Sequence, residues 1–404
     1  MTLLIKNAAV AYDEPHNLLL DVTRLIWRAW RGGLPTGIDR TCLAYAAHYR
    51  DRALAVVQRE GWTRVLSPKQ SRELFSLLLD ASGTRAPLVR FALGALAGRS
   101  KGETTGRLYL NVGHTGLNWP GHMDWIASSA VRPVYFVHDL IPLSHPEYCR
   151  PGEAEKHRAR IQALLHSGVG VIANSRDTLK ELDGFSRLQR GRTMPPGIVA
   201  PLGVDDLHAE RDSGVAPTLP GRPYFVMLGT IEGRKNHLLI LNIWAEMARR
   251  LGTNCPQLMI IGQRGWESEQ AVDMLERCEA IRGHVIELSR CDDAALVTYL
   301  RGASALLFPS FVEGYGLPLV EALALGTPVI ASDLAVFREL AGDIPDYLSP
   351  IDGLGWSGLI EDYSRAASPS RSAQMKRIAG YEAPSWKGHF ARVDYWLAGL
   401  HPVA

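Results

Sequence analysis

Two glutamates frame a glycine-containing turn in the stretch EGYGLPLVE, residues 313–321. Gly314 and Gly316 let the backbone come close to a ligand, and the free N–H groups that begin a following helix attract negative charge, which suits a diphosphate. Glu321, about one helical turn further on, can accept hydrogen bonds from vicinal hydroxyls such as those of a ribose, whereas Glu313 could bind the hydroxyls of a second sugar. Alternatively, Glu313 is a solvated loop acid and Glu321 a charge favoured by the helix dipole.

A second stretch, GTIEGRKN at 229–236, supplies the opposite charge. Its Arg234 and Lys235 could neutralise a leaving diphosphate, although two basic residues in a loop are usually no more than solvated. The glutamate turn in the same half of the chain favours the functional interpretation.

Both stretches follow a short apolar run, at 224–228 and 305–308, and both precede a helical pattern. Pro318 fits a first helical turn and Gly326 a helix C-terminus. We therefore expect strand, turn and helix at both places, with the charged residues at the carboxyl ends of parallel strands, where open α/β sheets bind ligands.

The same alternation runs through the chain and predicts an α/β fold of two Rossmann-like, doubly wound domains facing a cleft. We expect an N-terminal domain over 1–209, a Pro- and Gly-rich linker over 210–223, a C-terminal domain over 224–384 and an amphipathic last helix within 385–404. Strands are expected near 18–22, 53–57, 108–112, 133–138, 170–174, 198–202, 224–228, 257–261, 284–288, 305–308 and 328–331, and helices at 238–250 and 292–301.

Composition excludes several classes of protein. A net charge of +2 in 404 residues gives no reason to expect a nucleic-acid partner. Five widely spaced cysteines without a CxxC pair indicate neither a disulfide framework nor a zinc site, so we expect a reducing cytoplasm and no metal. No apolar run approaches the ~20 residues that span a bilayer, and residues 1–16 do not resemble a signal peptide.

Together these motifs resemble glycosyltransferase family four, the retaining enzymes of the GT-B fold. The resemblance rests on the Glu-x7-Glu pair Glu313 and Glu321 and on GTIEGRKN at 229–236. Further matches are FVHDLIPLSHPEY at 136–148, IANSRDTLKEL at 172–182, PLGVDD at 201–206, TGIDR at 36–40 and a terminal helix led by Trp386, which by resemblance returns to the N-terminal domain.

The resemblance implies a role for each matching residue. Glu321 would hold the donor ribose, and Glu313 with the backbone of Gly314, Tyr315, Gly316 and Leu317 would hold the transferred sugar and the phosphates. Arg234 and Lys235 would bind the diphosphate and stabilise it as leaving group, with no metal or other cofactor. His138 would lie beside the donor sugar, and Ser289 and Arg290 would meet the nucleobase.

The chain departs from the family pattern at two places. Many relatives carry Arg where this chain has Thr230, which leaves the phosphate clamp to Arg234 and Lys235. The first loop reads GGLPTGIDR, so either Gly33 or Gly37 would approach the donor.

Three weaker patterns have other interpretations. GLGWSG at 353–358 fits G-x-G-x-x-G literally, but it follows a turn instead of a strand, which argues against a nicotinamide site. The apolar stretch 85–101 with basic flanks fits a membrane interface or an ordinary buried helix. The basic aromatic run RLIWRAWR at 24–31 adds weight to surface attachment or to a polyanionic or lipid-diphosphate acceptor.

The resemblance therefore implies a hexosyltransferase that uses a nucleotide-diphosphate sugar and a glycan or lipid-linked acceptor in bacterial polysaccharide synthesis. GDP-mannose is the first expectation for the donor, because HDLIPLSHPEY with GT and RKN of 229–236 resembles mannosyltransferases. The protein would be cytoplasmic, with peripheral contact with the inner membrane left open. A non-catalytic nucleotide-sugar-binding subunit of an assembly complex is the alternative, and a nicotinamide-dependent oxidoreductase is a distant third.

Overall fold

A computed structural model describes residues 16–32, 35–60, 62–80, 104–189, 193–204 and 219–400, together with the isolated positions 87, 89 and 91. Within these residues the chain divides into two compact units. The N-terminal unit contains residues up to 143, residues 154–202 and residues from 386 onward. The C-terminal unit contains residues 144–153 and 203–385, so the stretch 144–153 departs from the expected N-terminal range 1–209.

The described part of the N-terminal unit is built on a seven-stranded sheet with the order β3-β2-β1-β4-β5-β6-β7. All neighbours are parallel except β3, which pairs antiparallel with β2. The strands are β1 (Leu18–Asp21), β2 (Ala53–Arg59), β3 (Trp62–Val65), β4 (Leu108–Asn111), β5 (Arg132–Val137), β6 (Gly170–Ala173) and β7 (Gly197–Val199).

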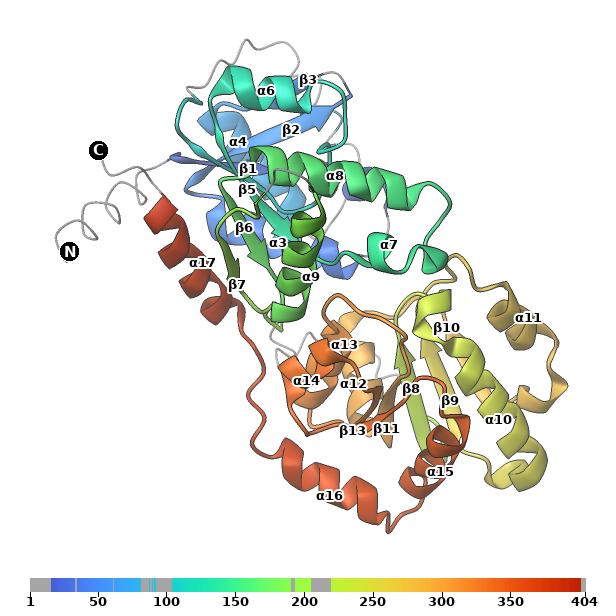
Figure 1. The fold of residues 1–404 in the computed structure, drawn as a ribbon. Coiled ribbons are helices and arrows are strands. Elements are labelled where there is room, and N and C mark those ends of the chain that lie inside the picture. Colours follow the sequence, from blue (N-terminus) through green and yellow to red (C-terminus); the bar gives the residue numbers. More distant parts are fainter. Residues whose placement is uncertain are drawn as a thin grey trace. The chain divides into compact units, whose positions relative to one another are not determined.

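Helices cover both faces of this sheet (Figure 1). Several begin at a side-chain cap, because Thr36, Ser67 and Ser175 each accept a hydrogen bond from a backbone N–H in the first turn that would otherwise lack a partner. The helices are α2 (Thr23–Arg31), α3 (Gly37–Tyr49), α4 (Pro68–Leu79), α6 (His122–Ser129), α7 (Ile141–Ser144), α8 (Glu153–Ser167), α9 (Arg176–Leu188) and α17 (Trp386–Leu400).

The terminal helix α17 packs in the N-terminal unit. It buries Phe390, Val393 and Leu397 of the expected apolar stripe. Its Asp394 accepts a hydrogen bond from Tyr49 at 2.7 Å and pairs with Arg52 at 3.2 Å.

The C-terminal unit holds a six-stranded, fully parallel sheet with the order β10-β9-β8-β11-β12-β13 in its described residues. This is the doubly wound arrangement, in which the order of the strands reverses between the two central strands, here β8 and β11. The strands are β8 (Tyr224–Leu228), β9 (Gln257–Ile261), β10 (Val285–Leu288), β11 (Ala305–Phe308), β12 (Val329–Ser332) and β13 (Asp346–Leu348).

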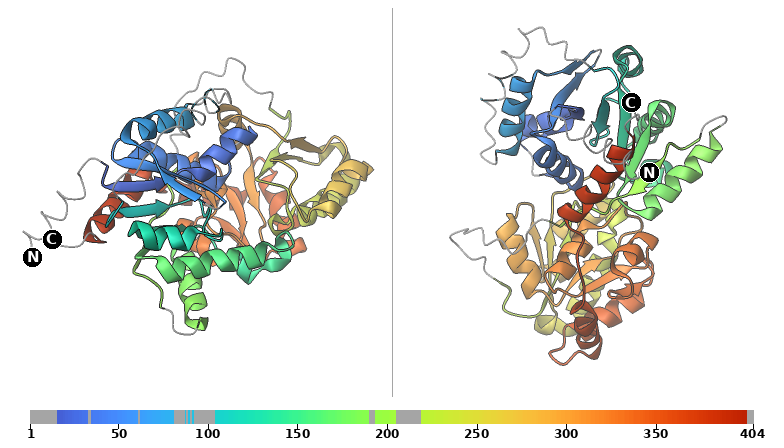
Figure 2. Two further views of the ribbon diagram at one scale, coloured as in Figure 1. Left: turned by 90° about the horizontal axis from the view of Figure 1, so that it is seen from above. Right: turned by 90° about the vertical axis from the view of Figure 1, so that its left-hand side faces the viewer.

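Two further views show the helices on either side of this second sheet (Figure 2). Its core includes the fully buried indoles of Trp244 and Trp356. The helices are α10 (His237–Leu251), α11 (Glu269–Arg277), α12 (Asp293–Gly302), α13 (Leu317–Ala324), α14 (Ala335–Ala341), α15 (Gly353–Tyr363) and α16 (Pro369–Ile378), with short 3-10 turns η1 (Pro146–Tyr148), η2 (Gly233–Lys235), η3 (Gly252–Asn254) and η4 (Glu279–Ile281).

The α/β fold class predicted from the sequence is confirmed, and most strands lie within two residues of their expected bounds. Strands β3 and β13 were not expected. The glycines of GLGWSG lie in the first turns of α15, whose Gly355 N–H is capped by Asp352, so this motif begins an ordinary helix. The predicted linker 210–223 and the stretch 85–101 lie largely outside the described residues, and no described helix has the length and hydropathy to cross a bilayer.

Candidate functional site

The two charged turns predicted from the sequence lie side by side at the switch point of the C-terminal sheet. One follows β8 and the other follows β11, and these strands are direct neighbours. The Phe311 N–H donates to the Arg234 carbonyl at 2.8 Å, and the Asn236 side chain donates to the Pro309 carbonyl at 3.2 Å. These cross-links fix the two turns relative to each other.

The Glu313 carboxylate lies between the two basic side chains. One oxygen accepts from the Arg234 guanidinium at 2.7 Å, and the other accepts from the Lys235 ammonium at 2.5 Å and from the Ser310 hydroxyl at 2.8 Å. Burial alone would disfavour the charge of Glu313, but Arg234 and Lys235 outweigh it and lower the pKa of this carboxyl to about 2. Glu313 is therefore ionised at neutral pH.

A second carboxylate completes this cluster. The Arg234 guanidinium also pairs with Glu232 at 2.6 Å, and Glu232 is 3% exposed. Two cations thus face two carboxylates when no ligand is bound. Sequence analysis did not assign a role to Glu232 or Ser310, although both lie within three residues of an assigned group.

Lys235 is held by an aromatic ring as well as by charge. Its ammonium lies 4.8 Å from the centroid of the Phe308 ring, and the whole residue is 8% exposed. A cation over a ring face gains electrostatic stabilisation, and burial strengthens that gain. The ammonium is therefore restricted in position before any ligand arrives.

The helix start after Glu313 has a backbone that only glycine accommodates well. Gly316 has φ of 117°, and a Cβ there would lie 2.7 Å from the Phe337 ring. Leu317 begins α13, Tyr315 is 5% exposed, and Glu321 in the second helical turn is 3% exposed. The glycine turn thus connects Glu313 of the charged cluster to the start of α13, four residues further along the chain.

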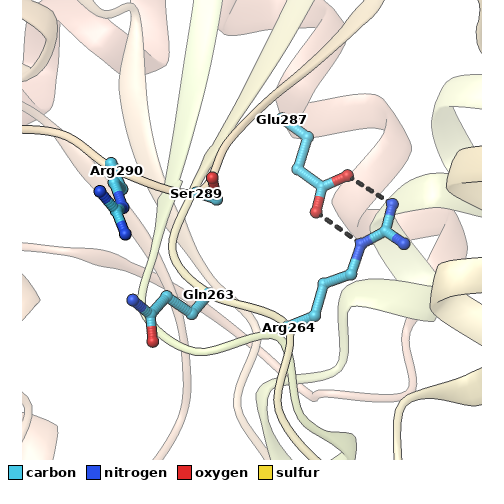
Figure 3. Close-up of a pocket in the computed structure, with 5 residues that line it drawn as sticks. All are labelled: Gln263, Arg264, Glu287, Ser289 and Arg290. Atoms are coloured by element: carbon cyan, nitrogen blue, oxygen red, sulfur yellow. Dashed lines mark hydrogen bonds and ion pairs between the residues drawn. The ribbon is translucent and has the colours of Figure 1, made fainter. Parts of the chain in front are cut away.

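A cavity of about 500 Å³ opens at the carboxyl ends of β9 and β10 and is lined by Gln263, Arg264, Glu287, Ser289 and Arg290 (Figure 3). The Arg264 guanidinium makes two hydrogen bonds with Glu287, at 2.8 and 2.9 Å, while Ser289 and Arg290 lie on the opposite wall and are exposed. Thr230, at the end of the neighbouring β8, has its methyl group close to Gly265. The cavity therefore shares the carboxyl edge of this sheet with the Glu313 cluster.

His138 and Gly37 belong to the N-terminal unit. His138 directly follows β5, is 5% exposed, and its Nε2 lies 2.7 Å from the Val112 carbonyl. Because a carbonyl can only accept, Nε2 carries the proton and Nδ1 is the nitrogen that can accept. Burial lowers the pKa of His138 to about 4, so the ring is neutral at pH 7. Gly37 is the first residue of α3, and Gly33 lies outside the described residues.

The N-terminal unit also has a buried polar network that the sequence did not reveal. The Asp21 carboxylate at the end of β1 accepts hydrogen bonds from Gln58 at 2.6 Å, Tyr109 at 2.9 Å and the Thr23 N–H at 3.0 Å. Burial raises the pKa of Asp21 to about 6. No described group of three or more His, Cys, Asp or Glu side chains is arranged to hold a metal ion.

An aromatic stack lies beside the charged cluster in the C-terminal unit. The Tyr148 ring stacks on Phe311 with centroids 5.6 Å apart and an interplanar angle of 9°. Trp266 donates its indole N–H to the Tyr148 carbonyl at 3.1 Å, and the Arg150 guanidinium lies 4.9 Å from the centroid of the Trp266 ring. This explains why residues 144–153 group with the C-terminal unit.

Comparison with known proteins identifies the class. Residues 210–344 match the sequence model of the family described as glycosyl transferases group 1, which covers the charged turns, the cavity and α13. The structure of HepE from Anabaena in complex with UDP-glucose superposes with a TM-score of 0.62 at 17% identity, covering 95% of this chain and 99% of that one. The chain therefore has the GT-B fold, its residues 210–344 are similar to group 1 glycosyl transferases, and the resemblance to glycosyltransferase family four is confirmed.

Curated relatives include mannosyltransferases. The serotype-specific mannosyltransferase WbdA of Escherichia coli is 26% identical over 243 residues, which are 56% of this chain and 29% of that protein. The O-antigen chain mannosyltransferase RfbU of Salmonella typhimurium is 43% identical over 97 residues, which are 24% of this chain and 26% of that protein. The chain thus matches less than a third of the length of either relative.

Proposed function

We propose that this protein is a glycosyltransferase that moves a hexosyl group from a nucleotide-diphosphate sugar to a glycan or lipid-linked acceptor. The observation that carries the proposal is the meeting of Glu313, Arg234 and Lys235 at the switch point of the C-terminal sheet, next to the start of α13. The similarity of residues 210–344 to group 1 glycosyl transferases supports it.

The cluster has the chemistry that a departing diphosphate requires. Breaking the bond between the sugar C1 and the phosphate oxygen leaves negative charge on the diphosphate, and buried cations fixed beforehand stabilise that charge best. Lys235 is a buried cation, and Arg234 is a partly buried one whose side chain is 22% exposed; Glu313 positions both. The N–H groups at the start of α13 would add partial positive charge. The Glu313 carboxylate, released from the cations, would then accept hydrogen bonds from sugar hydroxyls.

We propose a reaction without metal that retains the anomeric configuration. The acceptor oxygen would form its bond to C1 on the face from which the diphosphate leaves, and the acceptor proton would pass to a phosphate oxygen. His138, neutral and with Nδ1 able to accept, suits a hydrogen bond to a donor hydroxyl better than the role of a general acid.

For the donor we propose GDP-mannose, with the ribose on Glu321 and the base in the cavity lined by Ser289 and Arg290. The support is the similarity to two mannosyltransferases, one of which is described as acting on the O-antigen chain. The acceptor would then be a glycan or its lipid-linked precursor in bacterial polysaccharide synthesis. We place the reaction in the cytoplasm, at or near the inner membrane.

The test is a panel of nucleotide sugars with the full chain, read by thermal shift and by mass spectrometry of products. We expect GDP-mannose to raise the unfolding temperature and to be turned over or slowly hydrolysed. Glu313→Ala and Lys235→Ala should abolish turnover. Arg250→Ala, which breaks a surface ion pair with Glu361, is the matched control and should keep it.

Two outcomes would contradict the proposal. Binding of a nucleotide sugar without turnover, across acceptors of every plausible class, would favour a non-catalytic subunit. Turnover that survives Glu313→Ala and Lys235→Ala alike would show that the chemistry takes place elsewhere.

A further inference from the structure

Helix α2 presents two tryptophans to solvent on one side. Trp27 is 45% exposed and Trp30 is 52% exposed, and Arg31 beside them is exposed as well. Spacings of three and four residues place these side chains on one face of a helix. Leu25, which lies nearly opposite Trp27 around the helix, is buried, so the tryptophans lie on the side away from the core.

This face is also strongly basic. Helix α2 contains no acidic residue, and Arg28 and Arg31 lie in its last turn. The Arg31 guanidinium lies 5.9 Å from the centroid of the Trp27 ring, and Arg28 is half-buried. Within the described residues, Arg24 at the start of the helix pairs with Asp39 at 2.7 Å.

Other exposed apolar side chains in the described residues lack this combination. Ile351 and Leu354 form a pair with the same spacing and are 79% and 89% exposed, but neither is aromatic, and the acidic N-cap of α15, Asp352, is one of the two residues between them. Trp62 on β3 is 42% exposed, without a second exposed tryptophan three or four residues away. The α2 face is therefore distinguished by chemistry as well as by exposed area.

We propose that the face formed by Trp27, Trp30 and Arg31 docks on an anionic lipid bilayer. Indole rings favour the boundary between headgroups and acyl chains, because one edge is apolar and the N–H stays hydrated. Guanidinium groups at the same depth meet lipid phosphates, and each adds electrostatic attraction to a negatively charged leaflet. A neutral glycan would stack on the indoles but would gain little from the arginines.

This docking is independent of the proposed glycosyl transfer, and its test uses no donor or acceptor. The full chain is sedimented with vesicles of phosphatidylcholine, with or without phosphatidylglycerol. We expect binding to the anionic vesicles only, weakened by salt because screening acts on exposed charges. Arg31→Glu should lower the partition coefficient about thirty-fold, the equivalent of two charges at roughly 1 kcal/mol each.

Trp27→Ser with Trp30→Ser should lower the partition coefficient at least about tenfold, because the variant loses both indoles that would insert into the bilayer. Two matched controls should bind as the wild type does: Trp62→Ser, which removes an exposed tryptophan of the same unit, and Ile351→Ser with Leu354→Ser, which removes a larger exposed apolar pair. Unchanged thermal unfolding checks that each variant is folded.

Several results would overturn the proposal. They are equal binding to both kinds of vesicle, no binding to either, and undiminished binding after loss of the two tryptophans. The same protein is titrated with dextran sulfate to identify a general polyanion site. If Arg31→Glu weakens binding to both vesicles and dextran sulfate while the double tryptophan variant weakens binding to neither, α2 recognises charge alone and does not dock on a bilayer.

Discussion

Replacing Glu313 by Gln should lower the free energy of unfolding and yet raise the affinity for a diphosphate. The substitution keeps the size of the side chain and removes its charge. The amide group of Gln offers one acceptor oxygen, whereas the carboxylate accepts from Arg234, Lys235 and Ser310. At least one buried cation would then face an N–H donor.

The loss of stability follows from the pKa of Glu313, which falls from 4.5 to about 2 on folding. That difference corresponds to about 3 kcal/mol of stabilisation. Because the folded pKa is depressed, this stabilisation is present above pH 4.5 and is lost as the pH falls towards 2. At pH 7, Glu313→Gln should therefore lower the free energy of unfolding by about 3 kcal/mol.

The gain in ligand binding follows from the charges around the site. With Glu313 in place, two cations face two carboxylates. Without its charge, Arg234 and Lys235 face Glu232 alone, and an incoming anion no longer competes with Glu313 for them. We expect the affinity for inorganic pyrophosphate and for GDP to rise roughly tenfold, or about 1.4 kcal/mol.

Isothermal titration calorimetry with pyrophosphate and with GDP measures the affinity, and urea unfolding measures the stability. Lys235→Met is the comparison, because it removes a cation and should weaken both ligands. If Glu313→Gln weakens pyrophosphate binding as much as Lys235→Met does, Glu313 positions the cations and does not compete with the ligand, and the reasoning is wrong.

Three other perturbations test separate parts of the structure. Gly316→Ala should abolish pyrophosphate binding and cost at least about 1 kcal/mol, because a Cβ at φ of 117° meets the Phe337 ring; Gly326→Ala, with φ of 75° and open space, is the calorimetric control. In the wild type, the free energy of unfolding should fall by about 3 kcal/mol as the pH rises from 4 to 6, because the Asp21 carboxyl ionises near 3.8 when unfolded and near 6 when buried. Asp21→Asn should abolish this fall, which urea unfolding across that pH range measures. Asp394→Asn should lower the stability at pH 7 by about 2 kcal/mol and expose α17 to limited proteolysis, because basic and hydroxyl partners lower the pKa of this carboxyl to about 2 despite partial burial; unchanged cleavage would contradict the assigned packing.

The central strands could be predicted from the sequence because nearly all their residues are apolar. Strands such as β4, β8 and β11 are short apolar runs, and the sheet buries them on both faces. The two strands that sequence analysis missed are edge strands. Strand β3 has one exposed Trp, a half-buried Thr and Arg and one buried Val, and β13 has three half-buried residues. An edge strand needs little apolar surface, so its pattern is weak.

Glu313 and the two cations beside it were named from the sequence, but the direct pairing of Glu313 with both cations was not. Glu313 and Lys235 are separated by 78 positions, and they meet because β8 and β11 are neighbours in the sheet. Asp21 likewise looks like the polar end of a leucine run, and its partners Gln58 and Tyr109 lie 37 and 88 positions away. Strand order decides which loops touch, and no local pattern encodes that order.

The pairing itself suggests how diphosphate and sugar recognition are coupled. A buried Lys235 and a partly buried Arg234 would be costly without partners, so Glu313 stabilises them while the site has no ligand. A bound diphosphate can take over that role only by replacing the carboxylate, which must then find other hydrogen-bond donors. Sugar hydroxyls attached to the same diphosphate are the nearest such donors. A nucleotide sugar would supply both the diphosphate for the two cations and the hydroxyls for Glu313, whereas a nucleoside diphosphate would supply the diphosphate alone. The site would therefore bind the intact donor more tightly than the nucleoside diphosphate product.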